Sequence, residues 1–285
     1  MAKLLLFADL SPIDDALFYN ANRMVKEMNI EEICICHYVE IQEVTDDVRN
    51  YFNDLPKPLE EILQEDFEEK ATAQGLDASL LTYKIHLSGG KDDLINWVNR
   101  SDYDLCVFGK KVVHSGTGVF SGRLGRLMEK SVLFITESTK INTRRLLLPT
   151  EFSKYSKKAA EQVNRLKSFI PEEITVLHVF HVSPTYFPFI SELSEDIIEK
   201  ERKHAQKEMK HFCKKYFPDR EVLQKVLYAG DSTTAKLIYD YAITNRIDLI
   251  VMGAKGKTDD DEILIGSVAE KLIQTDKNIP VLLVR

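Results

Sequence analysis

The feature that most constrains this chain is an internal repeat. Three stretches of the first half return in the second half: LLLFADLS at Leu4 returns as LLLPTEFS at Leu146, ICICHYVE at Ile33 as ITVLHVFH at Ile174, and DYDLCVFGKK at Asp102 as RIDLIVMGAK at Arg246. The offset between matching positions stays between 141 and 144 residues. Such a constant offset predicts two copies of one structural unit in tandem. We therefore expect one domain at 1–140 and another at 141–285, joined within the polar stretch 138–145.

Each copy alternates short apolar runs with longer amphipathic ones. In the second half the pattern predicts strands at 145–150, 174–181, 222–229, 247–253 and 280–285, and helices at 154–169, 193–216, 232–245 and 267–275. Continuous apolar runs such as LIVMG and VLLV suit strands that are covered on both faces. Alternation of strands with helices favours a parallel sheet with right-handed crossovers. The expected fold is a doubly wound, parallel, five-stranded α/β sheet in each half.

Composition narrows the function classes. The chain has 285 residues, of which 44% are apolar, so it can bury a sizeable core. A formal net charge of -7 argues against binding to the phosphate backbone of a nucleic acid. The apolar run in the opening MAKLLLFADLS is too short for the core of a signal peptide, and no later apolar stretch is long enough to suggest a membrane span. We expect a cytoplasmic protein with reduced cysteines that binds neither nucleic acid nor membrane.

One glycine-rich stretch, GAKGKTDDDEILIGS at 253–267, suggests a phosphate-binding loop. It is not a Walker A loop, because the residue five before Gly256 is Val251. Its frame is Gly253, two residues, Gly256, nine residues, Gly266 and Ser267, and it joins the end of a predicted strand to the start of a predicted helix. Glycine lets a ligand approach the backbone, and the N–H groups at a helix start attract anions. A loop that only connects a strand to a helix, without binding a ligand, could have the same pattern of glycines and serine.

These residues resemble a known family. The four-point frame, the LLLPTEFS opening and the VAEKLI and IPVLLVR endings look like a tandem universal stress protein of the ATP-binding type. The resemblance implies an adenine nucleotide alpha hydrolase-like fold, with the two sheets packed as a pseudo-dimer. It also implies ATP as the ligand, held by backbone contacts to the three loop glycines and by Ser267 at the phosphates, with Val268 also in the nucleotide site. By the same resemblance, Glu151 lies by the ribose and the backbone near Val179 meets adenine, although aspartate is the usual acid.

The first half departs from this pattern. Its frame reads Gly109, Val112, Gly122 and Arg123, so valine replaces a glycine and arginine replaces the serine. It keeps Asp9, the usual acid. We expect an empty or weak site here, and a remodelled anion site with Arg123 as its countercharge remains the alternative.

Candidate catalytic and metal residues are weakly supported. No nucleophile with a paired base is visible, so we predict no catalytic residue. Two groups have the residue types of metal ligands. Cys34, Cys36 and His37 lie on a predicted strand, and His204, His211 and Cys213 lie on a long predicted helix. We expect the first group in the core and the second on a solvated helix face, with no metal site. The acidic run at 259–262 fits a solvated loop better than a Mg²⁺ site.

The leading hypothesis is an ATP-binding stress-response or regulatory protein, with the nucleotide mainly in the second domain and an unknown regulatory protein as its partner. It makes one intramolecular pseudo-dimer, and further association into a homodimer stays open. One alternative is a slow Mg-dependent ATPase or phosphotransfer enzyme. The other is a structural dimer module whose sites are vestigial.

Overall fold

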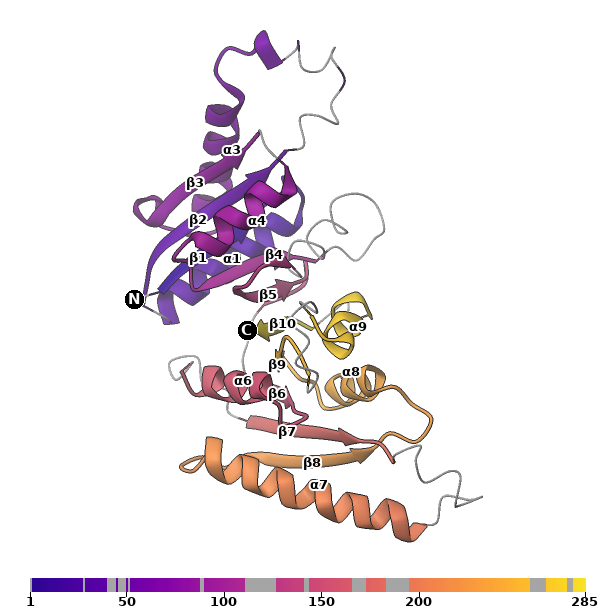
Figure 1. Cartoon of the computed structure of the whole chain (residues 1–285). Helices are drawn as coiled ribbons and strands as arrows, with labels where there is room; N and C mark the ends of the chain where they lie inside the picture. Colours follow the sequence, from indigo (N-terminus) through magenta and orange to yellow (C-terminus); the bar gives the residue numbers. More distant parts are fainter. Residues whose placement is uncertain are drawn as a thin grey trace. The chain divides into compact units, whose positions relative to one another are not determined.

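The structure is a computed structural model of the whole chain, and it describes residues 2–27, 29–39, 45, 50, 52–87, 90–110, 127–140, 144–165, 173–182, 195–256, 265–275 and 279–285. The chain divides into two compact units, Met1–Ile141 and Asn142–Arg285. Each unit has one parallel five-stranded sheet with helices on both faces (Figure 1). The predicted fold class, two tandem doubly wound α/β sheets, is therefore confirmed. Their packing as a pseudo-dimer stays a prediction.

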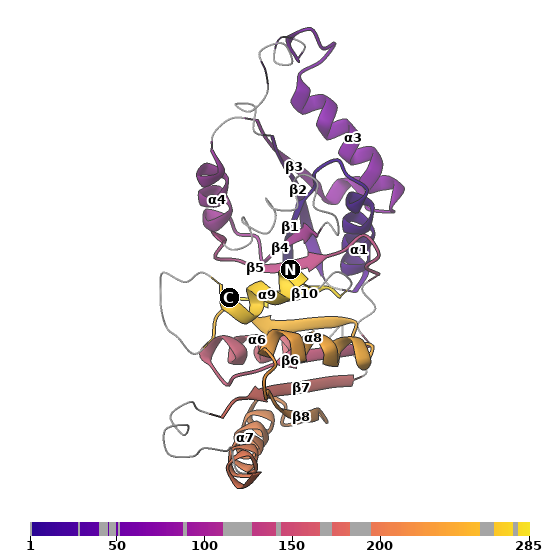
Figure 2. The ribbon, with the colours of Figure 1, turned by 90° about the vertical axis from the view of Figure 1, so that its right-hand side faces the viewer.

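The first unit follows the expected alternation of strands and helices. Its elements are β1 (Ala2–Phe7), α1 (Ile13–Glu27), β2 (Ile30–Tyr38), α3 (Leu59–Ala73), the 3₁₀ helix η2 (Ala78–Leu80), β3 (Leu81–His86), α4 (Lys91–Arg100), β4 (Leu105–Gly109) and β5 (Ser131–Ile135). The strands are ordered β3-β2-β1-β4-β5, and every pair is parallel. Helices α1 and α3 cover one face of the sheet and α4 covers the other (Figure 2).

The second unit repeats this topology. Its elements are β6 (Arg145–Pro149), α6 (Lys154–Arg165), β7 (Glu173–Phe180), α7 (Glu195–Tyr216), β8 (Leu223–Tyr228), α8 (Thr234–Thr244), β9 (Leu249–Gly253), α9 (Ser267–Thr275) and β10 (Val281–Val284). The strand order is β8-β7-β6-β9-β10, again parallel throughout. Helices α6 and α7 pack together over one part of the sheet, and α8 packs against α9.

The central strands form the core of each unit because helices cover both of their faces. Leu4, Leu5 and Leu6 in β1 are at most 1% exposed, and all five residues of β9 are buried. Continuous apolar runs are therefore required here, since either face of the strand meets a helix. None of the helices in the described part of the chain combines the length with the apolar composition that a bilayer-spanning segment requires.

A reciprocal hydrogen-bond pair fixes the amino ends of the strands in both units. The Lys3 amide donates to the Asp104 carboxylate over 2.9 Å, and the Asp104 amide donates to the Lys3 carbonyl over 3.0 Å. Arg145 and Asp248 make the same two bonds in the second unit, each of 2.9 Å. The first strand of each unit is thereby held in register with the fourth.

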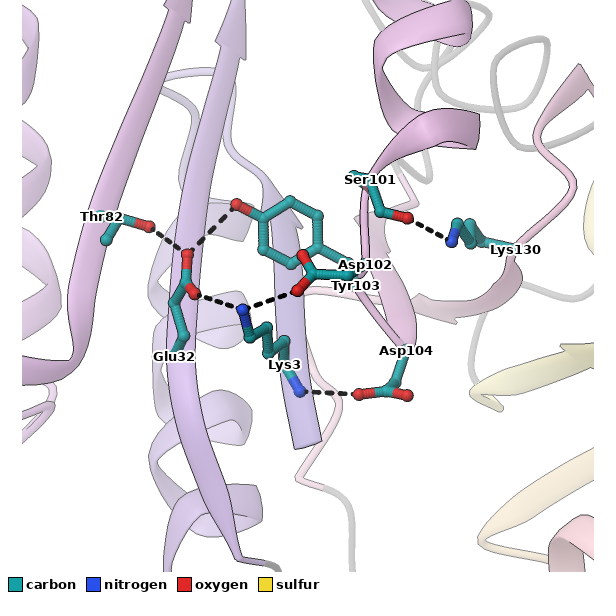
Figure 3. A network of polar contacts seen from close by, with 8 residues as sticks. All are labelled: Lys3, Glu32, Thr82, Ser101, Asp102, Tyr103, Asp104 and Lys130. Carbon is teal, nitrogen blue, oxygen red and sulfur yellow. Dashed lines mark hydrogen bonds and ion pairs between the residues drawn. The ribbon is translucent and has the colours of Figure 1, made fainter. Parts of the chain in front are cut away.

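Around Lys3 the reciprocal hydrogen-bond pair is part of a larger polar network at the amino ends of the strands (Figure 3). The Lys3 ammonium lies 2.8 Å from Asp102 and 3.2 Å from Glu32. The hydroxyls of Thr82 and Tyr103 donate to Glu32 over 3.1 and 3.3 Å. Because Asp102 is largely in solvent and Lys3 is partly exposed, we assign this network to strand alignment and not to a binding site.

The carboxyl end of β1 is held by a buried carboxylate. Asp14, in the first turn of α1, is 1% exposed and accepts the amides of Asp9 over 3.1 Å and Leu10 over 2.8 Å. These bonds hold Leu10 in the left-handed region, at φ 61°. Burial raises the pKa of Asp14 to about 7, with Asp9 adding to the rise, although the two amide bonds and Lys70 oppose it. The second unit has Ser156 at the repeat position.

We expect this carboxylate to make stability depend on pH. Its folded pKa lies above the roughly 3.9 of an exposed aspartate, so the folded state binds the additional proton. The free energy of unfolding should then fall as the pH rises from about 4 to about 7, by at most about 1.4 kcal/mol per pH unit. Asp14→Asn should remove that part of the slope in urea unfolding, whereas Ser156→Ala should keep it. An equal slope in Asp14→Asn and the unaltered protein would contradict the assignment.

Candidate functional site

The second unit contains a cavity of about 270 Å³ at the carboxyl ends of β6, β7 and β9, beside the starts of α8 and α9. Ligands of doubly wound sheets bind at this edge. All seven residues predicted for the second half line it: Glu151, Val179, Gly253, Gly256, Gly266, Ser267 and Val268. Residues that are more than a hundred positions apart in the sequence thus meet around one cavity.

The floor of the cavity is apolar. Pro149, Leu177 and Val179 come from β6 and β7, Met252 comes from β9, and Ile238 from α8 closes one side. Leu177 and Val179 share a face because side chains two apart on a strand point the same way. Such a floor offers contact area to a flat ring system and few polar partners to select one.

His178 lies between the two β7 floor residues and does not line the cavity. Its Nδ1–H donates to the Thr150 carbonyl over 2.7 Å, and its ring lies 4.5 Å from that of Phe152. In the first unit His37 donates to the Ala8 carbonyl over 2.8 Å. Both imidazoles therefore hold the end of the first strand against the second, as expected for packed histidines.

Glu151 is positioned by a tight turn between β6 and α6. The hydroxyls of Ser153 and Ser156 both donate to its Oε1, the latter over 3.4 Å. Phe152 adopts φ 65°, and its amide donates to the Thr150 hydroxyl over 3.0 Å. The turn places a half-buried carboxylate at the mouth of the cavity, held through only one of its two oxygens by these serines.

The three loop glycines differ in what an added Cβ would meet. A Cβ on Gly253 would lie 2.7 Å from the carbonyl carbon and the Cβ of Tyr155, so this glycine serves the packing of β9 on α6. The expectation that Gly253 mainly admits a ligand is thus incomplete. At Gly266 a Cβ would meet loop backbone at 3.4–3.5 Å, and its amide donates to the Ala254 carbonyl over 2.7 Å. A Cβ on Gly256 would meet no described atom within 4 Å.

Several lining residues were not predicted from the sequence: Thr150, Leu177, His181, Thr234, Ile238, Met252 and Lys255. The alternation of a strand would have added Leu177 to Val179. Lys255 stands between two predicted glycines. His181 and Thr234, by contrast, carry no local signal. The structure brings them together in a 2.8 Å hydrogen bond between the residue after β7 and the first residue of α8.

The first unit repeats the turn and the strand-end glycine. Ser11 donates to Asp9 as Ser153 does to Glu151. A Cβ on Gly109 would lie 2.7 Å from the side chain of Ile13, the repeat counterpart of Tyr155. The scaffold that carries the acid and the glycine is therefore the same in both units.

The corresponding floor of the first unit is aromatic. Phe7, Tyr38 and Phe108 occupy the repeat positions of Pro149, Val179 and Met252. The rings of Phe7 and Phe108 stack at 4.1 Å with an interplanar angle of 8°, and Phe108 is 1% exposed. Tyr38 stacks on His86 at 5.6 Å. Bulky rings thus lie where the second unit has smaller side chains.

Two predicted features lie outside the described residues. These are Gly122 and Arg123 of the first-half loop, and the acidic run 259–262 that an Mg²⁺ ion would need.

The candidate metal ligands are mostly where they were expected. Cys34, Cys36 and His37 are buried, at 2%, 0% and 7% exposure. Cys213 was expected on a solvated face, which is wrong: it is 4% exposed because α7 packs against β8. Its thiol lies 3.7 Å from the sulfur of Met209, one turn earlier in the same helix. Within the described part of the chain, no three histidine, cysteine or acidic side chains are placed to hold a metal ion.

Comparison with known proteins agrees with this architecture. The sequence profile of the universal stress protein family matches residues 142–285. Universal stress protein MJ0531 of Methanocaldococcus jannaschii is 29% identical over 149 residues, which cover 50% of this chain and 82% of that protein. Universal stress protein MJ0577 of the same organism is 26% identical over 160 residues, covering 50% and 94%.

A solved structure extends the likeness to both units. The crystal structure of a universal stress protein from Archaeoglobus fulgidus has a TM-score of 0.64 at 18% identity, and the match covers 99% of this chain and 98% of that one. This likeness shows that the fold continues through the first unit.

The glycine geometry predicts a ranked series of stabilities. Gly253→Ala forces a Cβ against backbone and should lower the free energy of unfolding by about 1–3 kcal/mol. Gly109→Ala meets side-chain atoms of Ile13 and no backbone among its nearest neighbours, so it should cost less, and Gly256→Ala should cost nothing measurable. Chemical unfolding followed by circular dichroism gives the order. If Gly256→Ala were the most damaging of the three, the packing reason given for Gly253 would be wrong.

Proposed function

The chain belongs to the universal stress protein family, and from this premise we propose that it is a stress-response regulatory protein that binds ATP in its second unit. The observation that carries the proposal is the convergence of three groups on one cavity. An apolar floor, a half-buried carboxylate and a glycine-serine loop at a helix start all line it. These groups match in kind the three parts of an adenine nucleotide: base, ribose and phosphates.

Each of these groups suits one part of the nucleotide. The floor residues of β6, β7 and β9 offer apolar contact to the base. Glu151 offers a carboxylate to ribose hydroxyls. Gly256, Gly266 and Ser267 bring backbone and the start of α9, where N–H groups attract anions, to the phosphates. The cavity of about 270 Å³ lies near the lower end of the roughly 300–1,000 Å³ of small-molecule sites.

Comparison of the first unit with the second favours one nucleotide per chain. To seat a base in the first unit, the stacked Phe7 and Phe108 rings would have to separate, and such pairs contribute about 0.5–1.5 kcal/mol beyond their burial. The loop also reads Val112 where the second unit has Gly256. We therefore propose that the first unit binds adenine nucleotides weakly or not at all, and that binding without rapid turnover is the activity.

The acids at repeat positions provide a matched test of this assignment. Glu151→Ala removes a charged hydrogen-bond acceptor and should weaken ATP binding about 10- to 100-fold. Asp9→Ala makes the same change in the first unit and should leave the affinity within about twofold. Isothermal titration measures both, with an expected stoichiometry near one ATP per chain. The reverse pattern would place the nucleotide in the first unit.

Gly256 allows binding to be separated from folding. Gly256→Val copies the first-half residue, and the Cβ that it adds at the wall of the cavity would meet no described atom within 4 Å. We expect a melting temperature like that of the unaltered protein and an ATP affinity at least about tenfold lower, since close approach of phosphate to the backbone is lost. Thermal unfolding and titration of the same sample decide this. Unchanged affinity would show that the phosphates do not lie at this loop.

A further inference from the structure

Phe152, the residue after Glu151, has a backbone conformation that bulky residues rarely adopt. Its φ is 65°, in the left-handed region, where the Cβ of an L-residue comes close to the following carbonyl oxygen. Glycine takes this conformation without that cost, whereas a large side chain keeps it only where the surrounding structure holds it. The turn that carries Glu151 therefore depends on the contacts of Phe152.

Phe152 is held through both its amide and its ring. The amide donates to the Thr150 hydroxyl over 3.0 Å. The ring centroid lies 4.5 Å from that of His178 on β7 and 5.7 Å from that of Phe212 on α7, distances at which aromatic side chains attract one another. His178 in turn donates to the Thr150 carbonyl over 2.7 Å, and Phe212 is 3% exposed. The Phe152 ring thus joins the turn to a strand and to a helix.

The first unit holds the same turn in another way. Leu10 is the repeat counterpart of Phe152 and has φ 61°, but it is 42% exposed. The buried Asp14 carboxylate accepts its amide over 2.8 Å. The second unit has Ser156 at the position of Asp14, and the Ser156 hydroxyl donates to Glu151. The second unit therefore has the aromatic contacts of Phe152 where the first unit has a buried carboxylate.

Glu151 is oriented by groups of its own turn. The hydroxyls that donate to its Oε1 come from Ser153 and Ser156, which lie two and five residues further along the chain. These bonds fix the carboxylate relative to the turn, and they move with the turn. The Phe152 ring ties this turn to β7 and α7, although Phe152 does not itself line the cavity. The direction in which the carboxylate faces the cavity thus depends on packing outside the cavity.

We propose that Phe152 is a positioning residue for the nucleotide: its ring, packed against His178 and Phe212, keeps the Glu151 carboxylate directed at the ribose. This inference rests on the proposed function and deepens it, because it makes recognition of the ribose depend on the contact between the turn and α7. Binding of the base and of the phosphates, which is assigned to other lining residues, does not depend on this ring.

The test compares ATP with 2′,3′-dideoxy-ATP, which has no ribose hydroxyl to donate to a carboxylate. Phe152→Gly keeps a residue that adopts the left-handed conformation and removes the ring. Titration should show an ATP affinity about 3- to 30-fold lower, a smaller loss than in Glu151→Ala because the carboxylate is still present. The affinity for 2′,3′-dideoxy-ATP should stay within about twofold of that of the unaltered protein, since this ligand makes no hydrogen bond to Glu151.

Three further variants make the comparison specific. Phe152→Leu copies the first-unit residue without the ring contacts, should show the same selective loss, and replaces Phe152→Gly if that variant does not fold. Leu10→Gly makes the equivalent change in the first unit and should leave both affinities within about twofold. Glu151→Ala combined with Phe152→Gly should bind ATP within about twofold of Glu151→Ala alone, because the ring acts through the acid. Thermal unfolding of each sample shows that the compared proteins are folded.

The outcomes separate this role from the proposed function. Equal weakening of both ligands, unchanged ATP affinity in the two Phe152 variants, or additive losses in the double variant would each overturn the positioning role and leave the nucleotide site in place. If the unaltered protein bound both ligands equally, the assignment of Glu151 to the ribose would be wrong, and this inference with it. If it bound neither ligand, the proposed function would fall as well.

Discussion

The candidate site depends on the contact between the end of β9 and the first turn of α6. Gly253 can lie against Tyr155 only because it has no Cβ. That contact brings the loop after β9 next to the turn after β6, so the glycines and Glu151 face the same space. A Cβ at this position would lie 2.7 Å from Tyr155 and push the two elements apart. The distance between Glu151 and the loop glycines would change with it.

The two units share the backbone conformation at the end of their first strand and differ in the side chains around it. Each has a non-glycine residue in the left-handed region after its acid, at Leu10 and Phe152, and each has a histidine that donates to the end of the first strand. In both units a serine two residues after the acid donates to it, Ser11 in one and Ser153 in the other. The second support of the turn differs: the buried carboxylate of Asp14 in the first unit and the hydroxyl of Ser156 in the second. The floor differs most, because three positions carry aromatic rings in the first unit.

The order and type of the elements could be predicted from the sequence because they depend on local patterns. An apolar run such as that of β9 predicts a doubly covered strand, and the glycine-serine frame marks the end of that strand and the start of α9. The reason for Gly253 could not be predicted, since its neighbour Tyr155 is distant in the chain. Cys213 was misplaced for a related reason: the charged sequence of α7 does not reveal which narrow stripe β8 will cover. The contact of His181 with Thr234 likewise exists only after two strands and a helix are in place.

The aromatic floor of the first unit has a consequence for symmetry. An assembly of identical chains must present the same binding surface in every copy, so a substitution that fills one pocket fills them all. When two units share a chain, each position is encoded twice and the copies can diverge separately. Phe7 and Phe108 illustrate this, because the first unit has these two aromatic rings where the second unit has Pro149 and Met252. A tandem chain can therefore fix the ratio of open to filled units in its sequence, independently of protein concentration or exchange of subunits.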